Sequence, residues 1–321
     1  MAGWKWRFWR VLRELRRAGV LGINRRNGDY VLLGNPRAHY PRVDDKLLTK
    51  RICEAHGIPV PQTYAAIERH GDIRRFFELI PGRQQFVIKP GRGSEGRGIV
   101  VVVERDGAEL VTAGGQRLSL ADVRYHLSTI LSGLYSLGGQ PDCAIVEQRI
   151  VRHEVFAGIA VGGTPDVRIV LYRGVPVMAM VRLPTHESRG RANLHQGAIA
   201  AAIHLGRGVT YGGVCRNRAL SVHPDTGATI EGIAIPFWKD LLSAAMKLAD
   251  AVELAYLGVD FVLDAAVGPV ILEANARPGL AIQVANRRGL LPRLQWIDRH
   301  RDAMPSPDRR LELVAQVAEA Q

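Results

Sequence analysis

The sequence predicts an α+β fold in which most strands pair antiparallel. Two segments have the pattern of β-hairpins, at 167–184 and 258–279, and no steady alternation of strand, helix and parallel strand is found. The 321 residues are 47% hydrophobic and 23% charged, which is typical of a globular protein with a substantial core. The length alone fits one large domain or two modest ones.

The first expected element is a basic amphipathic helix at 4–17. Apolar side chains recur on one face, and six bases accompany a single acid, Glu14. Such a helix either packs on the body of the protein with a solvated basic face, or lies on an anionic membrane surface. Arginines interrupt its apolar stretches, so a cleavable signal peptide is not expected. The chain also lacks the run of about 18 apolar residues that a membrane-spanning helix needs.

From about Asp44 onward, helices and strands are expected in turn. A helix at 44–57 should end at Gly57, because glycine tolerates the conformation that terminates helices. A second helix is expected at 118–135, capped by Ser119 or a neighbour, and a third at 236–258. Extended segments are expected at 58–67, 86–90, 98–104 and 143–150, and the chain after Leu290 is polar and basic with one short terminal helix.

The charge balance narrows the classes of partner. Lys and Arg total 43 against 31 Asp and Glu, a net charge of +12, which fits nucleic acid, an anionic membrane or an anionic substrate. Nucleic acid is not expected as a partner, because no helix-turn-helix pattern, RNP motif or zinc spacing accompanies the charge. The three cysteines are widely spaced, which argues against a disulfide framework and indicates a reducing, cytoplasmic compartment.

A glycine-rich loop, GRGSEGRG at 91–98, lies between two expected strands. Glycines let backbone N–H groups converge on phosphate oxygens. A dinucleotide-binding loop would be followed by a helix, and a Walker A loop would end in Lys-Ser/Thr, and neither is present. Protein kinases place their lysine after the loop, whereas Lys89 precedes this one. The sequence therefore favours a lid over phosphates, against the alternative of an ordinary glycine-rich turn.

The hairpin at 258–279 carries a candidate metal site. Glu273 and Asn275 are two residues apart on one strand and so share a face, and Asp260 lies on the strand that pairs with it. Two carboxylates and an amide oxygen form a ligand set that suits Mg²⁺, which prefers oxygen and is completed by substrate phosphates. The alternative is a surface hairpin whose acids are solvated. The residues that flank these acids are apolar, and a carboxylate in an apolar setting needs a partner, which favours the metal site.

Taken in order, these segments resemble a known family. Lys46 in VDDKLLTK, GIPVP, Lys89 in FVIKP, the glycine lid, VEQRI, RANLHQG and VDFVLD…VILEANARPG follow one another as in the ATP-grasp fold. Within that fold, the chain is similar to alpha-L-glutamate ligase-like proteins related to RimK-type ligases, over about residues 22–290. The resemblance implies two α+β subdomains that clasp ATP. It places a helix and linker at 1–44, the ATP-grasp domain at 45–290 with its lid at about 86–104, and a C-terminal tail at 291–321.

The resemblance also implies roles for matching positions. Glu154 is either a ribose contact or a solvated loop acid. His195 is expected to be structural rather than a general base. The residues implied to bind ATP are Lys46, Lys89, Gly91, Gly93, Ser94, Gly96, Gly98, Glu147, Gln148, Ile150 and Glu154. The residues implied to face the reacting carboxylate are Arg168, Arg182, Arg191 and Asn193, and those implied to hold Mg²⁺, or Mn²⁺ in its place, are Asp260, Glu273 and Asn275.

The implied activity is ATP-dependent ligation of a carboxylate to an amine. Oxide is a poor leaving group, so transfer of the γ-phosphoryl group of ATP first makes an acylphosphate, which the amine then attacks. The expected partners are small-molecule or peptide carboxylates and amines, with glutamate a candidate donor. The alternative is an ATP- and Mg-binding partner or regulator without ligase activity. The expected location is the cytoplasm, at the inner face of the membrane if the N-terminal helix binds lipid. RimK-type ligases carry a sizeable domain before the ATP-grasp fold, where this chain has about 44 residues, so the acceptor is left open.

Overall fold

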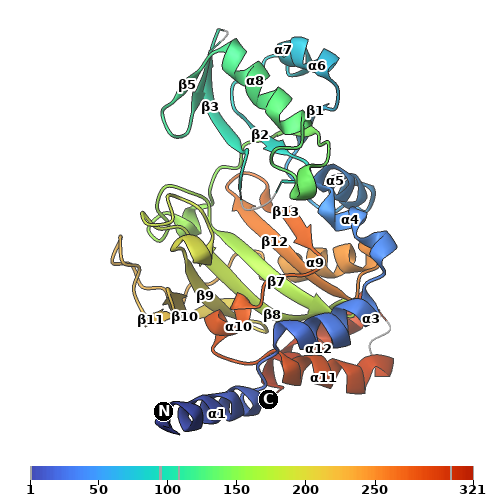
Figure 1. The fold of residues 1–321 in the computed structure, drawn as a ribbon, viewed down its shortest axis with the longest axis vertical. Helices are drawn as coiled ribbons and strands as arrows, with labels where there is room; N and C mark the ends of the chain where they lie inside the picture. The colour runs from blue at the N-terminus through green and yellow to red at the C-terminus, as the bar shows by residue number, and fades with distance from the viewer. Residues whose placement is uncertain (1, 94–95, 108, 304–305, 321) are drawn as a thin grey trace.

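Two antiparallel sheets, one above the other, form the framework of the protein (Figure 1). The computed structural model describes residues 2–93, 96–107, 109–303 and 306–320. Within these ranges, the smaller sheet has six strands in the order β1-β6-β2-β3-β4-β5, and the larger has seven in the order β11-β10-β9-β8-β7-β12-β13. The α+β class predicted from the sequence is confirmed.

The smaller sheet forms the upper subdomain in Figure 1. Its helix α8 begins at the Ser119 cap that the sequence predicts, and Ser119 and Asp122 exchange hydrogen bonds as a capping box. Helices and sheet enclose a core that includes Phe76, Phe86 and Leu127. The elements of this subdomain are β1 (Thr63–Ile67), α6 (His70–Arg74), α7 (Phe76–Leu79), β2 (Phe86–Pro90), β3 (Val100–Asp106), β4 (Glu109–Thr112), β5 (Arg117–Leu118), α8 (Leu120–Leu131) and β6 (Ala144–Glu147).

The larger sheet contains both predicted hairpins. The first turns at Arg173 and Gly174, whose φ angles of 48° and 71° are those of a tight hairpin turn. Helices α9, α11 and α12 share one continuous core with the sheet. The elements are β7 (Asp166–Tyr172), β8 (Val175–Leu183), β9 (Ile199–His204), β10 (Val209–Cys215), β11 (Arg218–Leu220), α9 (Trp238–Val252), β12 (Tyr256–Asp264), β13 (Gly268–Asn275), α10 (Ala281–Asn286), α11 (Leu291–His300) and α12 (Pro307–Glu319).

The N-terminal residues form a chain of helices that leads to the site. Helix α1 projects away from the body, below the larger sheet (Figure 1). On the described part of this helix, Trp9 and Leu15 are 56% and 44% exposed, so the alternative of a helix packed on the body is not what the structure shows. The elements are α1 (Ala2–Arg17), α2 (Ile23–Arg25), the π-helical turn η1 (Arg26–Val31), α3 (Leu32–Gly34), α4 (Pro41–Asp44) and α5 (Lys46–Ala55).

Two expectations about secondary structure are corrected. The helix expected over 236–258 ends at Val252, because Glu253 takes a left-handed conformation with φ 54° and a fully buried strand begins at Tyr256. The polar segment after Leu290 forms two helices rather than one. The arginines make this segment look like a solvated tail, but two of them form their polar contacts inside the fold. Arg293 is buried and donates to Val177 O, and Arg310 pairs with an aspartate on α9.

Leu294→Ala is expected to lower the free energy of unfolding by about 2–5 kcal/mol. Leu294 lies on α11, beyond the predicted domain boundary at residue 290, yet its side chain is fully buried in the core of the larger sheet. Chemical denaturation measures the effect, with Leu134→Ala as the control, since Leu134 is 68% exposed. Equal stability of the two variants would show that the segment after residue 290 does not belong to this core.

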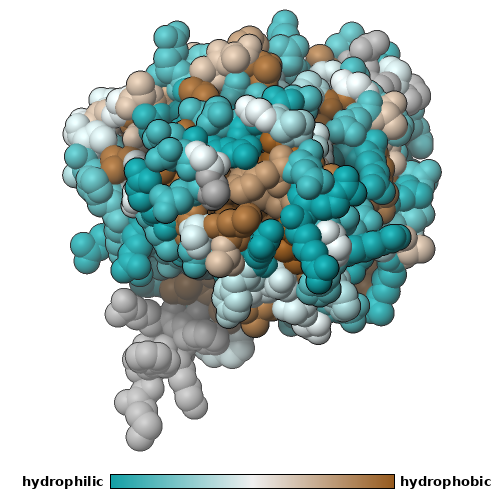
Figure 2. Space-filling view, turned by 90° about the horizontal axis from the view of Figure 1, so that it is seen from above, coloured by the Kyte–Doolittle hydropathy of each residue, from teal (hydrophilic) through white to brown (hydrophobic). Residues whose placement is uncertain are grey.

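The surface is mostly polar on the face that Figure 2 presents, with apolar side chains gathered over a smaller area near its centre. Among the described residues, no helix combines the length and apolar character that crossing a bilayer demands.

Candidate functional site

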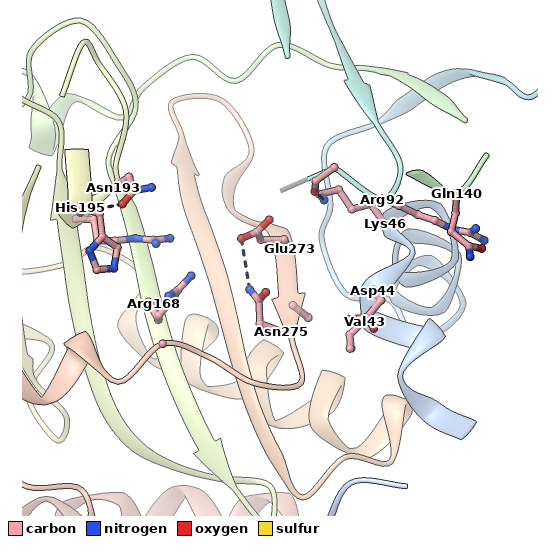
Figure 3. A pocket seen from close by; sticks show the side chains of 14 residues that line it. Val43, Asp44, Lys46, Arg92, Gln140, Arg168, Asn193, His195, Glu273 and Asn275 are labelled. Atoms are coloured by element: carbon pink, nitrogen blue, oxygen red, sulfur yellow. Dashed lines mark hydrogen bonds between the residues drawn. The ribbon is translucent and has the colours of Figure 1, made fainter. Parts of the chain in front are cut away.

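Two adjoining cavities lie between the sheets. They share Lys46, Arg182 and Glu273 in their walls. The apolar cavity, of about 320 Å³, is lined by Lys46, Val87, Lys89, Ile99, Val101, Glu147, Gln148, Arg149, Ile150, Thr164, Asp166, Arg182, Asp260, Val262, Leu272 and Glu273. The polar cavity, of about 590 Å³, is lined by Val43, Asp44, Lys46, Arg92, Gly93, Gln140, Arg168, Arg182, Asn193, His195, Glu273, Ala274, Asn275 and Gly279 (Figure 3).

Lys46 stands at the junction of the two cavities. It is the first residue of α5, whose N-terminus is capped by the Asp45 carboxylate accepting from two backbone N–H groups. Its backbone N–H donates to Gly91 O at 3.0 Å, and its ammonium group donates to Gly93 O at 2.5 Å. Burial lowers the pKa of Lys46, although the charge of Glu273 opposes the shift. The lysine is thus held against the glycine loop and faces Glu273 on the opposite sheet.

The glycine loop is shaped by close packing at its base. The N–H of Gly91 donates to Cys143 O at 2.8 Å, and the N–H of Arg92 donates to the Asp142 carboxylate at 3.0 Å. In this conformation those two N–H groups are therefore not directed at a ligand. A Cβ atom on Gly93 would lie 2.3 Å from Pro90 Cγ, so a larger residue does not fit there.

The far end of the loop requires glycine for a second reason. Gly96 and Gly98 have φ angles of 71° and 74°, a region that other residues rarely adopt. A Cβ atom on Gly98 would also lie 2.6 Å from the Tyr135 ring. Ser94, which the sequence analysis placed among the ATP-binding residues, lies outside the described residues.

A buried ion triad supports the wall of the apolar cavity. Glu147 is 3% exposed and bonds Lys89 through Oε1 at 2.5 Å and Lys50 through Oε2 at 2.6 Å. Burial raises the pKa of Glu147, but the charges of Lys89 and Lys50 outweigh this and hold it below its usual range. Lys89 therefore lines the apolar cavity while its ammonium group pairs with a buried carboxylate, and Glu147 orients the lysine.

A row of charged side chains crosses the larger sheet. Arg168 on β7 is the register partner of Asp260 on β12, and Asp260 is in turn the partner of Glu273 on β13. Directly opposite residues in antiparallel strands share a face, so the three side chains lie in line. The bulge that leaves Leu272 unpaired lies next to Asp260, and both Leu272 and Glu273 line the apolar cavity.

Two arginines converge on Asp260. Arg168 binds it bidentately, with Nε–Oδ1 at 2.6 Å and Nη2–Oδ2 at 2.5 Å, and Arg182 Nη2 donates to Oδ2 at 2.9 Å. Arg182 also pairs with Asp166 through Nε at 2.5 Å. Burial raises the pKa of Asp260, but the charges of Arg168 and Arg182 more than compensate and hold it well below its usual range. Two guanidinium groups thus balance two aspartates, which leaves Glu273, whose charge acts on Lys46, as the acid of the cluster without an arginine ion pair.

Glu273 and Asn275 fit a divalent cation better than Asp260 does. Both point into the polar cavity, with Asn275 Nδ2 donating to Glu273 Oε1 at 3.4 Å (Figure 3). Turning the amide by half a turn would present its oxygen beside the carboxylate, which is the chemistry that Mg²⁺ prefers. Asp260 already accepts three hydrogen bonds, so little of its oxygen surface is left for a metal.

Not every predicted site residue reaches a cavity. Asn193 caps the turn η5 (Leu194–Gln196) and lines the polar cavity, but Arg191 is exposed and donates to Gln196 Oε1 at 3.3 Å. Glu154 is exposed in the turn η4 (Glu154–Phe156) and is not among the residues that line either cavity. The predicted roles of these residues stay predictions.

Some site residues were missed from the sequence. Lys50 lies one helical turn after Lys46, so it shares a helix face with a residue that was selected. Asp166 precedes Arg168 by two positions, which puts both on one face of β7. His195 was expected to be structural, and its side chain lines the polar cavity. The spacing of Lys50 and Asp166 relative to selected residues can be seen in the sequence. Which residues they pair with, Glu147 and Arg182, cannot be seen there.

Comparison with known proteins defines the family. The model of the family described as "Sugar-transfer associated ATP-grasp" matches residues 25–299, which is most of the chain. The chain therefore belongs to this ATP-grasp family, as the sequence motifs predicted.

Individual relatives are distant. A curated protein of Halorhodospira halophila named "Probable alpha-L-glutamate ligase" is 25% identical over 293 residues, covering 91% of this chain and 71% of that protein. The ATP-grasp ligase PsnB, solved with its minimal precursor, is 15% identical with a TM-score of 0.39, over 77% of this chain and 56% of that one. D-alanine–D-alanine ligase from Bacillus anthracis, solved with ATP, is 15% identical with a TM-score of 0.41, over 87% of this chain and 67% of that one. This chain thus spans little more than half of the PsnB ligase.

Proposed function

We propose that the protein is an ATP-dependent carboxylate–amine ligase that works through an acylphosphate. The observation that carries the proposal is the place of the Arg168–Asp260–Glu273 row. It lies where the apolar cavity meets the polar cavity, and Lys46 at the start of α5 lines both cavities beside it. Such a junction offers a site for a nucleotide base on one side and for an acid and an amine on the other.

In this proposal the apolar cavity receives the adenine of ATP. Its walls include Val87, Ile99 and Leu272, whose side chains suit the faces of a purine. The triphosphate then extends toward Lys46 at the junction of the cavities, while Lys89 is held at the base of the loop by Glu147. The polar cavity receives the carboxylate and the amine.

Glu273 and Asn275 would hold Mg²⁺, with Asp260 beside them as an arginine-bound neighbour. The cation would supply charge neutralisation on the phosphate oxygens. Because Glu273 is the acid without a guanidinium partner in the cluster, it is the ligand whose charge is available for a cation. Mn²⁺ offers the same oxygen chemistry.

The transfer step depends on positioning and charge. Arg168 and Arg182 lie in the wall of the polar cavity, where they can stabilise the anionic oxygens of a carboxylate that approaches the γ-phosphate. A Cβ atom on Gly258 would lie 2.5 Å from Pro278 Cβ, so a larger residue does not fit there. If the transferring phosphoryl group needs an arginine, Arg168 or Arg182 would supply it.

The direct test is ADP release measured across acidic amino acids, each paired with candidate amines, and read together with product mass. Glutamate is the first donor to include, because the curated relative is named as a glutamate ligase. We expect ADP release that requires both an acid and an amine, with a product mass equal to their condensation. Nucleotide binding without turnover on any pair would favour the alternative function of an ATP-binding partner or regulator.

A further inference from the structure

We infer that α1 and the groove beside it form a docking surface for an anionic lipid bilayer. This surface, named here the N-terminal surface, consists of the apolar residues Val11, Leu15, Val20, Ile23 and Val284 with the bases around them. The inference does not depend on the proposed ligase activity, since it concerns a different face of the molecule.

Exposed apolar side chains concentrate in this part of the chain. Among the described residues, sixteen large hydrophobic side chains are exposed, and five of them fall within the fifteen residues from Trp9 to Ile23. Ile23 alone is 62% exposed. Isolated exposed apolar residues need no explanation, but those that lie side by side on one face indicate an interaction surface.

The apolar face of α1 continues onto the body of the protein. A groove of about 630 Å³ runs between the end of α1 and α10. Leu15, Val20 and Ile23 line one side and Val284 the other. Helix and groove therefore present one apolar surface rather than two separate patches.

The end of α1 is fixed to the body by backbone and amide hydrogen bonds. The N–H groups of Gly289 and Leu291 donate to Ala18 O and Gly19 O, each at 3.1 Å. The buried Gln283 side chain donates to Leu21 O at 3.0 Å and accepts from Leu21 N at 2.8 Å. The projecting helix thus keeps its direction relative to α10, which preorganises the surface.

The charge around this surface selects an anionic partner. Six bases and one acid occupy residues 4–17, and that acid, Glu14, is within 3.6 Å of Arg10. Arg287 and Arg288 add two exposed bases at the groove. A second copy of the chain would bring the same positive charges together, so like-charge repulsion disfavours a dimer through this face.

The composition of the helix favours lipid over other anions. Three of the five tryptophans of the chain are Trp4, Trp6 and Trp9, and tryptophan prefers the interface between headgroups and acyl chains. The side chains of Trp4 and Trp6 lie outside the described part of the structure. Helix α1 is at the end of the molecule opposite the smaller sheet (Figure 1). Docking through α1 therefore leaves the subdomain of the smaller sheet away from the membrane.

Flotation with lipid vesicles tests the inference and needs no nucleotide or substrate. The full chain should float with vesicles of 70% phosphatidylcholine and 30% phosphatidylglycerol, and not with pure phosphatidylcholine. Each base near such a surface contributes about fivefold to partitioning, so Arg287→Glu with Arg288→Glu should reduce it by more than about tenfold. Leu15→Ser with Val284→Ser should also reduce it, because less apolar area enters the interface.

The matched controls are Arg124→Glu and Leu134→Ser on the smaller subdomain, where both side chains are exposed. These variants should float like the parent protein, and about 0.5 M salt should release the parent protein from the vesicles. Equal flotation with zwitterionic vesicles, or unchanged flotation of the surface variants, would overturn the inference. A lipid-free dimer that Leu15→Ser converts to a monomer would assign the face to a second copy instead.

Discussion

Glu273→Gln is expected to reduce ATP turnover by at least about a hundredfold, the range lost when one preorganised charge-stabilising group is removed. The substitution keeps the size of the side chain and deletes its charge. Glu273 is the acid of the cluster without a guanidinium partner, whereas Asp166 and Asp260 are neutralised by Arg182 and Arg168. Loss of its charge therefore removes the strongest attraction for Mg²⁺ at the junction of the two cavities.

Steady-state ADP release over a range of Mg²⁺ concentrations measures this effect. Glu312→Gln is the matched control, because Glu312 is exposed on α12 and lines neither cavity. The control should retain full turnover, and both variants should keep the melting temperature of the parent protein. Turnover of Glu273→Gln within threefold of the parent would rule out this residue as the metal ligand.

Glu147→Met is expected to lower the free energy of unfolding by about 3–5 kcal/mol, the usual cost of removing one partner from a buried charge pair. Glu147, Lys50 and Lys89 are each at most 7% exposed at the side chain. The variant leaves two ammonium groups buried next to each other without a counter-ion. Lys50→Met should cost less, because Glu147 still pairs with Lys89.

The lowered pKa of Glu147 determines how the difference in stability between parent and variant changes with pH. Because the two lysines hold the pKa of Glu147 below its ordinary value of 4.5, its contribution is fully present above that pH. The contribution is lost as the pH falls through the lowered pKa, so the stability gap between parent and variant should narrow only below about pH 4.5. Urea unfolding from about pH 2.5 to about pH 8 measures the gap, because the narrowing takes place below the ordinary pKa of the carboxyl group. A gap that stays constant across the whole range, or a larger loss in Lys50→Met, would contradict the triad.

Local patterns in the sequence were enough to place much of the site. The hairpins were predictable because strand pairing followed short turns, at Arg173–Gly174 and at 265–267. The spacing of Glu273 and Asn275 put them on one face of their strand. These features depend on residues that are neighbours in the chain.

Features that depend on long-range pairing were not predictable in the same way. The sequence selected Arg168, Arg182 and Asp260, but only the register of β7, β8 and β12 shows that the arginines neutralise the aspartate. The Lys50–Glu147 pair joins residues that are 97 positions apart. Only one of the two C-terminal helices was predicted, because the charged composition of this segment suggested that it is exposed. Arg293 and Arg310 in fact make their polar contacts inside the fold.

Trapping with hydroxylamine shows whether the protein forms an acylphosphate. The protein is incubated with ATP, Mg²⁺ and the carboxylate that supports ADP release, with hydroxylamine in place of the amine. We expect a hydroxamate of that carboxylate in a one-to-one ratio with ADP, and none with Glu273→Gln. ADP formed without hydroxamate would contradict the proposed acylphosphate route.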